Sequence, residues 1–298
     1  MSDADAAPAA PPTNDLSTTS VRIYLPDERL RSFATFYYFV ECAGPLEDFL
    51  YPEWGNVRFS LSGSWWVEST QTRAAMPQIG ALFGPTDRAA KAISCGGKSA
   101  GFGLTPLGWQ RMLDVPADRM ANRIVDLDRA FFGVAGEDLR ARLAEPTTDQ
   151  EGVAVFDRLL LDRLAERRPN SEAAIRIDRV LRDRPSDVAA FAAAADMPPR
   201  TLGRICKQVF GFGAKRLLRR QRFLDTLGQI RITEHPNFST LMDAEYFDLA
   251  HFNHEFHEFM GLSPSQYIAV PRPLMGQAAL VQLQAGIPLS FKLPPPPG

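Results

Sequence analysis

Histidine is missing from the first 234 residues of the chain, and cysteine is scarce throughout. The N-terminal part therefore lacks the imidazole ligands that normally hold iron in cupin-style dioxygenases. The three cysteines lie far apart and form no C-x-x-C pair, which argues against a disulfide framework or a metal site. We expect Cys42, Cys95 and Cys206 to be small hydrophobic residues in a reducing cytoplasm.

Membrane-directing and catalytic patterns are missing as well. The sequence has no apolar run of membrane-spanning length and no secretory signal, so we expect a cytoplasmic protein without a membrane partner. It also has no Ser-His-Asp or Cys-His arrangement and no glycine-rich phosphate loop, and Ser60 does not lie in a nucleophile elbow. We therefore expect neither enzymatic activity nor a cofactor.

The composition is that of a soluble globular protein with room for two domains. Hydrophobic residues make up 45% of the 298 residues and charged residues 23%, which suits a chain that buries two cores. The net charge of −2 excludes a wholly basic nucleic-acid binder. Any surface that binds an acidic partner must therefore be a local basic patch.

The region before residue 168 is predicted to be rich in β-structure. After a disordered tail over 1–20, a short helix is expected over Asp27–Tyr38. Short β-prone runs follow, separated by turn residues such as Gly84-Pro85, which favours an antiparallel barrel or sandwich over a βαβ unit. The expected strands are Phe39–Cys42, Val57–Leu61, Trp65–Ser69, Ile79–Phe83, Ala92–Cys95 and Gly101–Leu104.

Helical periodicity replaces the strand pattern after Pro106, and a polar interruption at Glu166–Ser171 separates two domains. We place a β-rich domain with a helical C-terminal part at 21–168 and a second domain at 171–270. The proline-rich tail over 271–298 is expected to have no fixed fold, although one segment is apolar enough to dock. The expected helices are Trp109–Leu113, Glu137–Leu143, Val153–Arg167 and Ala173–Arg182, and the docking segment is Ala278–Leu283.

One pattern occurs twice in the second domain. A shift of fifty residues places the apolar positions of one copy on those of the other, and Gly211 on Gly261. Apolar residues recur at helical spacing before each glycine, and a glycine suits the left-handed residue that closes a helix. Because a short helix precedes each amphipathic helix, the pattern predicts two helix-turn-helix units. The short helices are Val188–Asp196 and Thr240–Tyr246, and the superimposed pairs include Leu202 with Phe252, Cys206 with Phe256 and Phe210 with Met260.

The two copies resemble the paired DNA-reading units of AraC-type transcription regulators. The resemblance rests on Asp187–Arg204 for the first unit and on Tyr246–Phe256 for the second, which is followed by Gly-Leu-Ser-Pro-Ser-Gln-Tyr from Gly261. It implies an α+β chain: an antiparallel β-rich domain with flanking helices, then an all-α domain whose two units are joined by a long helix over Ala214–Ile232. It also implies that the first domain senses a small molecule or dimerises.

Charge is unevenly distributed over the two units. Nine Lys or Arg residues and one acid lie between Pro199 and Arg231, whereas no Lys or Arg and six acids lie between Ile232 and Val270. Arginines on a groove-facing helix can read guanine, and other cations neutralise phosphates. We expect DNA contacts from Arg200, Thr201, Arg204, Lys207, Arg216 and Arg219 in the first unit and the linking helix, and from Ala250, Asn253, His254 and His257 in the second.

The second unit departs from the family pattern, which usually has Arg or Lys at His254 and His257. Three histidines at spacings of three also suggest a metal site, but the resemblance assigns His251 a structural role, so we expect no bound metal. The sequence favours a regulator that binds promoter DNA, contacts RNA polymerase, and takes a small-molecule effector or forms a homodimer. Two alternatives stay open: a protein-interaction regulator whose second unit no longer contacts DNA, and a DNA-damage sensor that accepts methyl groups on cysteine.

Overall fold

Alternating apolar residues in the first third of the chain build two antiparallel sheets that face each other. The computed structural model describes residues 19–68, 73–75, 80–127, 136–166, 169–233, 238, 246, 248–285 and 287. One sheet has the strand order β1-β2-β9-β4-β7-β10 and the other β3-β8-β5-β6. The strands are β1 (Thr19–Tyr24), β2 (Ala34–Cys42), β3 (Leu46–Leu50), β4 (Asn56–Ser60), β5 (Trp65–Glu68), β6 (Arg73–Ala75), β7 (Ala81–Phe83), β8 (Ala90–Ser94), β9 (Gly97–Leu104) and β10 (Ile124–Asp126).

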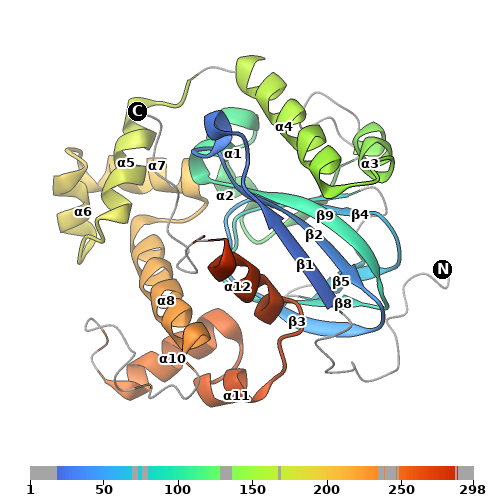
Figure 1. The fold of residues 1–298 in the computed structure, drawn as a ribbon. Coiled ribbons are helices and arrows are strands. Elements are labelled where there is room, and N and C mark those ends of the chain that lie inside the picture. Colours follow the sequence, from blue (N-terminus) through green and yellow to red (C-terminus); the bar gives the residue numbers. More distant parts are fainter. Residues whose placement is uncertain are drawn as a thin grey trace.

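Helices cover one end of the sheets and form the whole C-terminal region (Figure 1). A 3₁₀ turn, η3 (Glu28–Leu30), links β1 to β2. None of the described helices combines the length and apolar character that a membrane span requires. The helices are α1 (Pro106–Met112), α2 (Ala117–Met120), α3 (Gly136–Ala144), α4 (Asp149–Glu166), α5 (Glu172–Arg182), α6 (Val188–Ala194), α7 (Pro199–Phe210), α8 (Ala214–Ile232), α10 (Leu249–Met260), α11 (Pro264–Ala269) and α12 (Met275–Gln284).

The predicted fold class is confirmed: an antiparallel β-rich domain precedes a helical C-terminal region that contains a helix-turn-helix domain. The linking helix is α8, with the predicted bounds, and both amphipathic helices end where the sequence placed them. The helix expected over Thr240–Tyr246 lies outside the described residues, apart from Tyr246.

The helix expected over Asp27–Tyr38 is wrong. The Asp27 side chain accepts a hydrogen bond from the Arg29 amide and caps only the 3₁₀ turn. From Ala34 the chain is a strand that pairs with β1 on one side and β9 on the other. Aromatic and β-branched residues over this stretch suit a half-buried pleated surface, and two neighbouring strands decide between helix and strand.

Both ends of the described chain are more ordered than the sequence suggested. Strand β1 starts at Thr19, within the segment assigned to the N-terminal tail, and buries Val21 and Ile23. The C-terminal tail was expected to have no fixed fold, but α12 packs against β1 and closes the side of the β-sandwich (Figure 1). The predicted docking segment 278–283 lies within α12. Residues 1–18 and 288–298 lie outside the described part of the chain.

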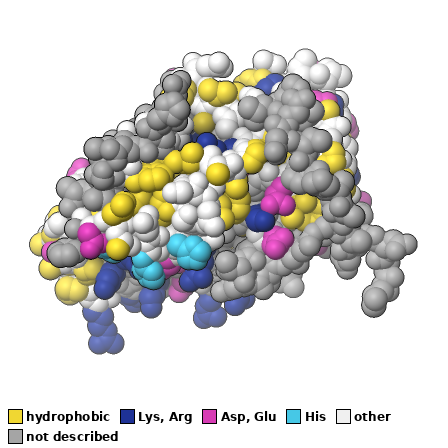
Figure 2. Space-filling view, turned by 90° about the horizontal axis from the view of Figure 1, so that it is seen from below, with side chains coloured by type: hydrophobic (Ala, Val, Ile, Leu, Met, Phe, Trp, Pro, Cys, Tyr) yellow, Lys and Arg dark blue, Asp and Glu magenta, His cyan; other side chains and the backbone are white. Residues whose placement is uncertain are grey.

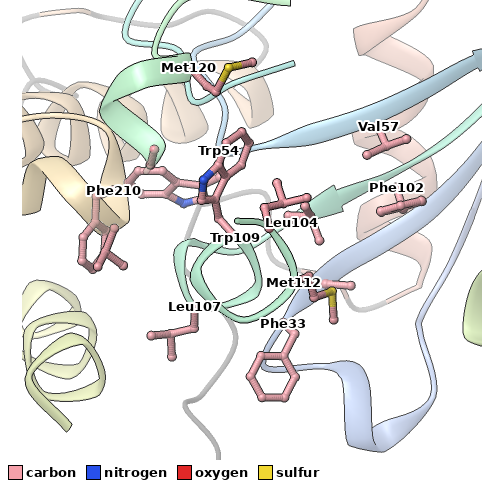
Figure 3. Packing of buried hydrophobic residues seen from close by; sticks show 14 of the residues in the cluster. Phe33, Trp54, Val57, Phe102, Leu104, Leu107, Trp109, Met112, Met120 and Phe210 are labelled. Atoms are coloured by element: carbon pink, nitrogen blue, oxygen red, sulfur yellow. The ribbon is translucent and has the colours of Figure 1, made fainter. Parts of the chain in front are cut away.

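The main hydrophobic core runs from the β-rich domain into the first helix-turn-helix unit without interruption. Trp54 and Trp109 from the first domain lie beside Phe210 of α7 (Figure 3), and the Trp54 and Phe210 ring centroids are 5.9 Å apart. A Cβ atom at Gly211, which closes α7, would come within 3.1 Å of Pro85. The two predicted domains therefore share one core.

Candidate DNA-binding surface

Helix α7 has one buried face and one basic face. Pro199 occupies its first turn, where the missing amide costs nothing, and Gly211 ends it with φ 86°. Four apolar side chains at helical spacing face the core: Leu202, Cys206, Val209 and Phe210. Upstream, the Asp187 carboxylate accepts a hydrogen bond from the Ala190 amide at 2.8 Å and fixes the start of α6. These local signals place α7 as the second helix of a helix-turn-helix unit.

The cationic side chains of α7 point into solvent. Arg200, Arg204 and Lys207 are exposed, and Thr201 is partly exposed. The Arg204 guanidinium donates a hydrogen bond to the Gln208 amide oxygen at 3.0 Å on the same face. Within the described part of the chain, neither Arg200 nor Lys207 forms an ion pair with a carboxylate. The charge of this face is therefore available to an anionic partner.

Helix α10 repeats the architecture of α7 with a different exposed face. The Asp248 carboxylate accepts a hydrogen bond from the His251 amide at 2.7 Å, and Gly261 closes the helix with φ 72°. Its core side holds Phe252, Phe256, Phe259 and Met260. Its exposed side holds Ala250, Asn253, His254 and His257, all named from the sequence.

The histidine side chains of α10 lie beside cationic side chains on one face of the molecule (Figure 2). Figure 2 shows the histidine side chains of α10 along an edge from which Lys and Arg side chains project. Among the described residues, no group of three His, Cys, Asp or Glu side chains is arranged to hold a metal ion. The surface therefore presents side chains that can donate and accept hydrogen bonds, next to a band of positive charge.

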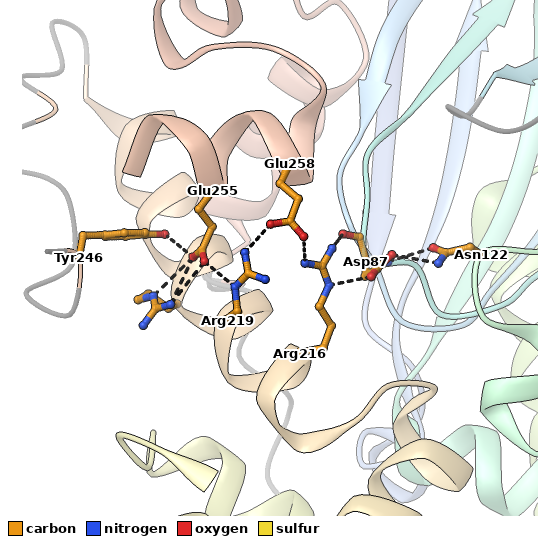
Figure 4. Close-up of polar contacts among 8 residues, drawn as sticks. Asp87, Asn122, Arg216, Arg219, Tyr246, Glu255 and Glu258 are labelled. Carbon is orange, nitrogen blue, oxygen red and sulfur yellow. Dashed lines mark hydrogen bonds and ion pairs between the residues drawn. The ribbon is translucent and has the colours of Figure 1, made fainter. Parts of the chain in front are cut away.

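Two residues predicted to contact phosphates are already paired within the protein (Figure 4). Arg216 donates from Nε to the Asp87 carboxylate at 2.7 Å and from Nη1 to Glu258. Arg219 donates from Nε to Glu255 at 2.7 Å and from Nη2 to Glu258. Both guanidiniums are only partly exposed, so in this conformation they face α10 and the N-terminal domain.

The ion pairs also neutralise two of the acidic residues counted in the second unit. Glu255 and Glu258 point toward the arginines of α8 (Figure 4). Burial by itself would raise the pKa of Glu258, but hydrogen bonds from Arg219 and the charge of Arg216 hold that pKa below its usual range. Burial likewise opposes the charge of Arg219, and the two carboxylates raise its pKa above the ordinary value. The exposed face of α10 is therefore less acidic than the sequence count implied.

A third arginine of α8 plays a part that the sequence did not signal. Arg220 is 1% exposed, lies over the Trp54 ring at 3.9 Å, and donates from Nε to the Thr86 carbonyl at 3.0 Å. Burial lowers the pKa of Arg220 to about 9. Both partners, Trp54 and Thr86, lie far from Arg220 in the sequence, so no local pattern separates it from Arg216 and Arg219. Arg220 anchors α8 in the N-terminal domain.

One family model and several solved structures are similar to this chain. Residues 191–269 match a family model described as a helix-turn-helix domain. Among solved structures, ToxT from Vibrio cholerae is similar over 84% of this chain and 98% of its own, with 8% identity and a TM-score of 0.47. The AraC-like transcriptional activator CuxR is similar over 70% of this chain and 86% of its own, with 14% identity and a TM-score of 0.30. No curated protein matches the chain.

Proposed function

We propose that the protein is an AraC-type transcription regulator that binds promoter DNA through α7 and α10, because residues 191–269 match a helix-turn-helix domain family. In this proposal Arg200 and Arg204 read base edges in the major groove, and Lys207 contacts the phosphate backbone. Asn253 has the amide group that suits adenine, and Ala250 has a methyl group that suits the methyl of thymine. Thr201, His254 and His257 complete the surface.

The observation that supports this proposal best is the exposed basic face of α7. Its three cations point into solvent, whereas Arg216 and Arg219 of α8 are paired with internal carboxylates. A solvated cation loses little when it meets a phosphate, and each neutralised phosphate releases bound counterions. Protein–DNA affinity should therefore depend on α7 more than on the remaining basic residues.

A binding assay on the DNA upstream of the protein's own gene tests the proposal. We expect tighter binding than to random DNA of equal length, and an affinity that falls steeply between low and moderate salt. The triple variant Arg200→Ala, Arg204→Ala, Lys207→Ala should lose binding to both DNAs. A control with exposed Arg158 of α4 changed to Ala should bind like wild type. Equal affinity for both DNAs, unaffected by the triple variant, would refute a role in DNA reading.

The N-terminal domain is proposed to sense an effector or to form a homodimer, and the DNA-bound protein to contact RNA polymerase in the cytoplasm. The inside of the β-sandwich is filled by side chains that include Trp65, Phe83 and Leu274. Since α12 covers this side, an effector that enters the sandwich from here must displace α12. Such a ligand regulates DNA binding only if it binds the two conformers unequally.

One observation favours the alternative in which only the first unit binds DNA. Helices α10 and α11 of the second unit carry no Lys or Arg. The nearby arginines of α8, Arg216, Arg219 and Arg222, are already paired with glutamates of α10. The Asn253→Ala variant separates the two readings. Weaker binding to the selected site, with unchanged binding to random DNA, supports contact by the second unit; unchanged binding to both favours a protein partner for α10.

A further inference from the structure

Two glutamates fasten the second reading helix to the linking helix. Glu255 is fully buried and accepts hydrogen bonds from Arg219 at 2.7 Å and from the Tyr246 hydroxyl at 3.0 Å. Arg222 approaches the same carboxylate at 3.4 Å. Glu258, one turn further along α10, is shared by Arg216 and Arg219. Three consecutive turns of α8 therefore donate to two turns of α10.

These ion pairs add direction to an interface that is otherwise apolar. Phe223 of α8 stacks on Phe259 of α10, with centroids 4.6 Å apart and planes at 11°. Burial of apolar area is non-directional, so stacked rings alone tolerate sliding and rotation of one helix on the other. Charge-assisted hydrogen bonds from planar guanidiniums have a narrow preferred geometry. The glutamates therefore fix the position of α10 along α8, which ring stacking alone does not determine.

The same contacts fix how far apart the two reading helices lie. Helix α7 packs against α8, and α10 is held by Arg216, Arg219 and Arg222 on the first three turns of α8. A rigid α8–α10 joint therefore presents α7 and α10 at one separation and one relative rotation.

We propose that Glu255 and Glu258 are positioning residues that make the protein demand one fixed spacing between the two DNA elements that α7 and α10 read. The inference rests on the proposed function, because it presumes that both helices meet DNA. The two carboxylates face the arginines of α8, so their proposed role is indirect. They act through Arg216 and Arg219, whose guanidiniums hold α10 in place.

Asp87 ties the N-terminal domain to the same joint. Its carboxylate accepts from Arg216 Nε at 2.7 Å and from the Asn122 amide at 2.9 Å (Figure 4). Two residues along the same loop, the Ala89 amide donates to the Phe259 carbonyl at 2.7 Å. The loop that follows β7 therefore touches both α8 and α10, and it limits the movement of the second unit relative to the first.

The test measures spacing preference, which a merely stabilising ion pair would not change. A binding site is first selected from random DNA by the wild-type protein, and its two protected elements are mapped by footprinting. The spacer is then lengthened and shortened by one and two base pairs. For wild type we expect about a tenfold loss or more at each changed spacing, as for one missed base contact. For Glu258→Gln we expect the loss to shrink to about two- to threefold.

A matched control removes an equally short ion pair elsewhere. Asp149→Asn breaks the pair with Arg22 between α4 and β1, far from the reading helices, and should keep the wild-type spacing preference. If thermal melting shows that Glu258→Gln does not fold, Arg216→Lys keeps the charge, loses the guanidinium fork, and should relax the spacing in the same way.

The outcomes separate this inference from the proposed function. Failure of wild type to select any DNA would refute the function itself. Selection of a site with only one protected element, or equal binding of wild type at all spacings, would overturn the positioning role while leaving DNA binding intact. A sharp spacing preference that Glu258→Gln or Arg216→Lys retains would overturn it as well. A relaxed preference in the variant and a sharp one in Asp149→Asn would support it.

Discussion

The arginines of the C-terminal region fall into three groups that their spacing does not separate. Arg200 and Arg204 are exposed, Arg216 and Arg219 are paired with acids, and Arg220 is buried against Trp54. The helical period predicted the buried and exposed faces of α7 correctly, because α7 packs on one side only. The arginines of α8 have partners in three other segments of the chain. Whether each of them is paired, buried or exposed therefore cannot be predicted from the spacing of residues within α8.

A single exposed arginine provides the first prediction at this scale. Arg204→Ala should weaken binding to the selected site by about 1–3 kcal/mol and relax the preference at one base pair, because a guanidinium donates two hydrogen bonds to one guanine. Titration of DNA variants at that position measures both effects. Arg158→Ala on α4 is the control. Equal losses on specific and random DNA would make Arg204 a phosphate contact instead of a base reader.

The exposed histidines of α10 offer a gain-of-function prediction. His254→Arg and His257→Arg place fixed charge where the family usually carries it, and each should tighten binding and steepen the logarithmic salt dependence by about 0.9 per new phosphate contact. Affinity measured at several salt concentrations at one pH gives the slope. Leu280→Arg, on the exposed face of α12, adds the same charge away from the proposed surface. If Leu280→Arg steepens the salt dependence equally, the effect of the His→Arg changes comes from net charge and not from a contact between α10 and DNA.

At the scale of elements, the repeated unit was predictable because its signals are local. Apolar spacing, the capping residues Asp187 and Asp248, and the glycines that close α7 and α10 all lie within each helix or beside it. Strand β1 and helix α12 were missed because each acquires its structure from a distant segment. The amides of Leu274 and Met275 donate to Asp48, 226 and 227 residues away in the chain. No local pattern reports such a partner.

That distant cap makes the docking of α12 sensitive to pH. Burial raises the pKa of Asp48 to about 6 despite hydrogen bonds from three backbone amides. Because this pKa lies above that of the unfolded chain, the folded state binds the proton more tightly. The contribution of Asp48 to stability is therefore full below about pH 4 and is lost as pH rises to about 6. Between pH 7 and pH 5 the gain should be about 1 kcal/mol.

Comparison of wild type with Asp48→Asn isolates this contribution, since asparagine at that position does not titrate. Denaturant unfolding at pH 5 and pH 7 should show a larger stability gain on acidification in wild type than in the variant. Asp149→Asn is the neutral control. Arg22 and Tyr24 lower the Asp149 pKa against the effect of burial, so its contribution to stability disappears only below about pH 4 and should not change between pH 7 and pH 5. An identical pH response in wild type and Asp48→Asn would mean that Asp48 is ionised and solvated in the folded protein.

At the scale of the whole molecule, the predicted boundary near residue 168 divides the chain but not the core. Buried residues of α1 and α2 pack against α7, and those of the second unit reach Tyr51, whose hydroxyl is 2.7 Å from that of Tyr267. The composition of the polar span 166–171 predicts a change of segment. The composition of this span does not predict whether the regions before and after it pack against each other, because such packing depends on the shapes of both folded surfaces.

A shared core predicts that the full chain unfolds in one cooperative step. Trp54 contacts Phe210 of α7 and Arg220 of α8 from the β-rich domain, and it is 8% exposed. Trp54→Ala should lower the free energy of unfolding by about 3–5 kcal/mol and should lower the melting temperature of both regions together. Calorimetry and far-ultraviolet circular dichroism report the transition, and Leu25→Ala, at an exposed leucine, is the control. Two separate transitions in wild type, with only one of them shifted by Trp54→Ala, would show that the helix-turn-helix region folds independently and that the contacts of Trp54 join two finished domains.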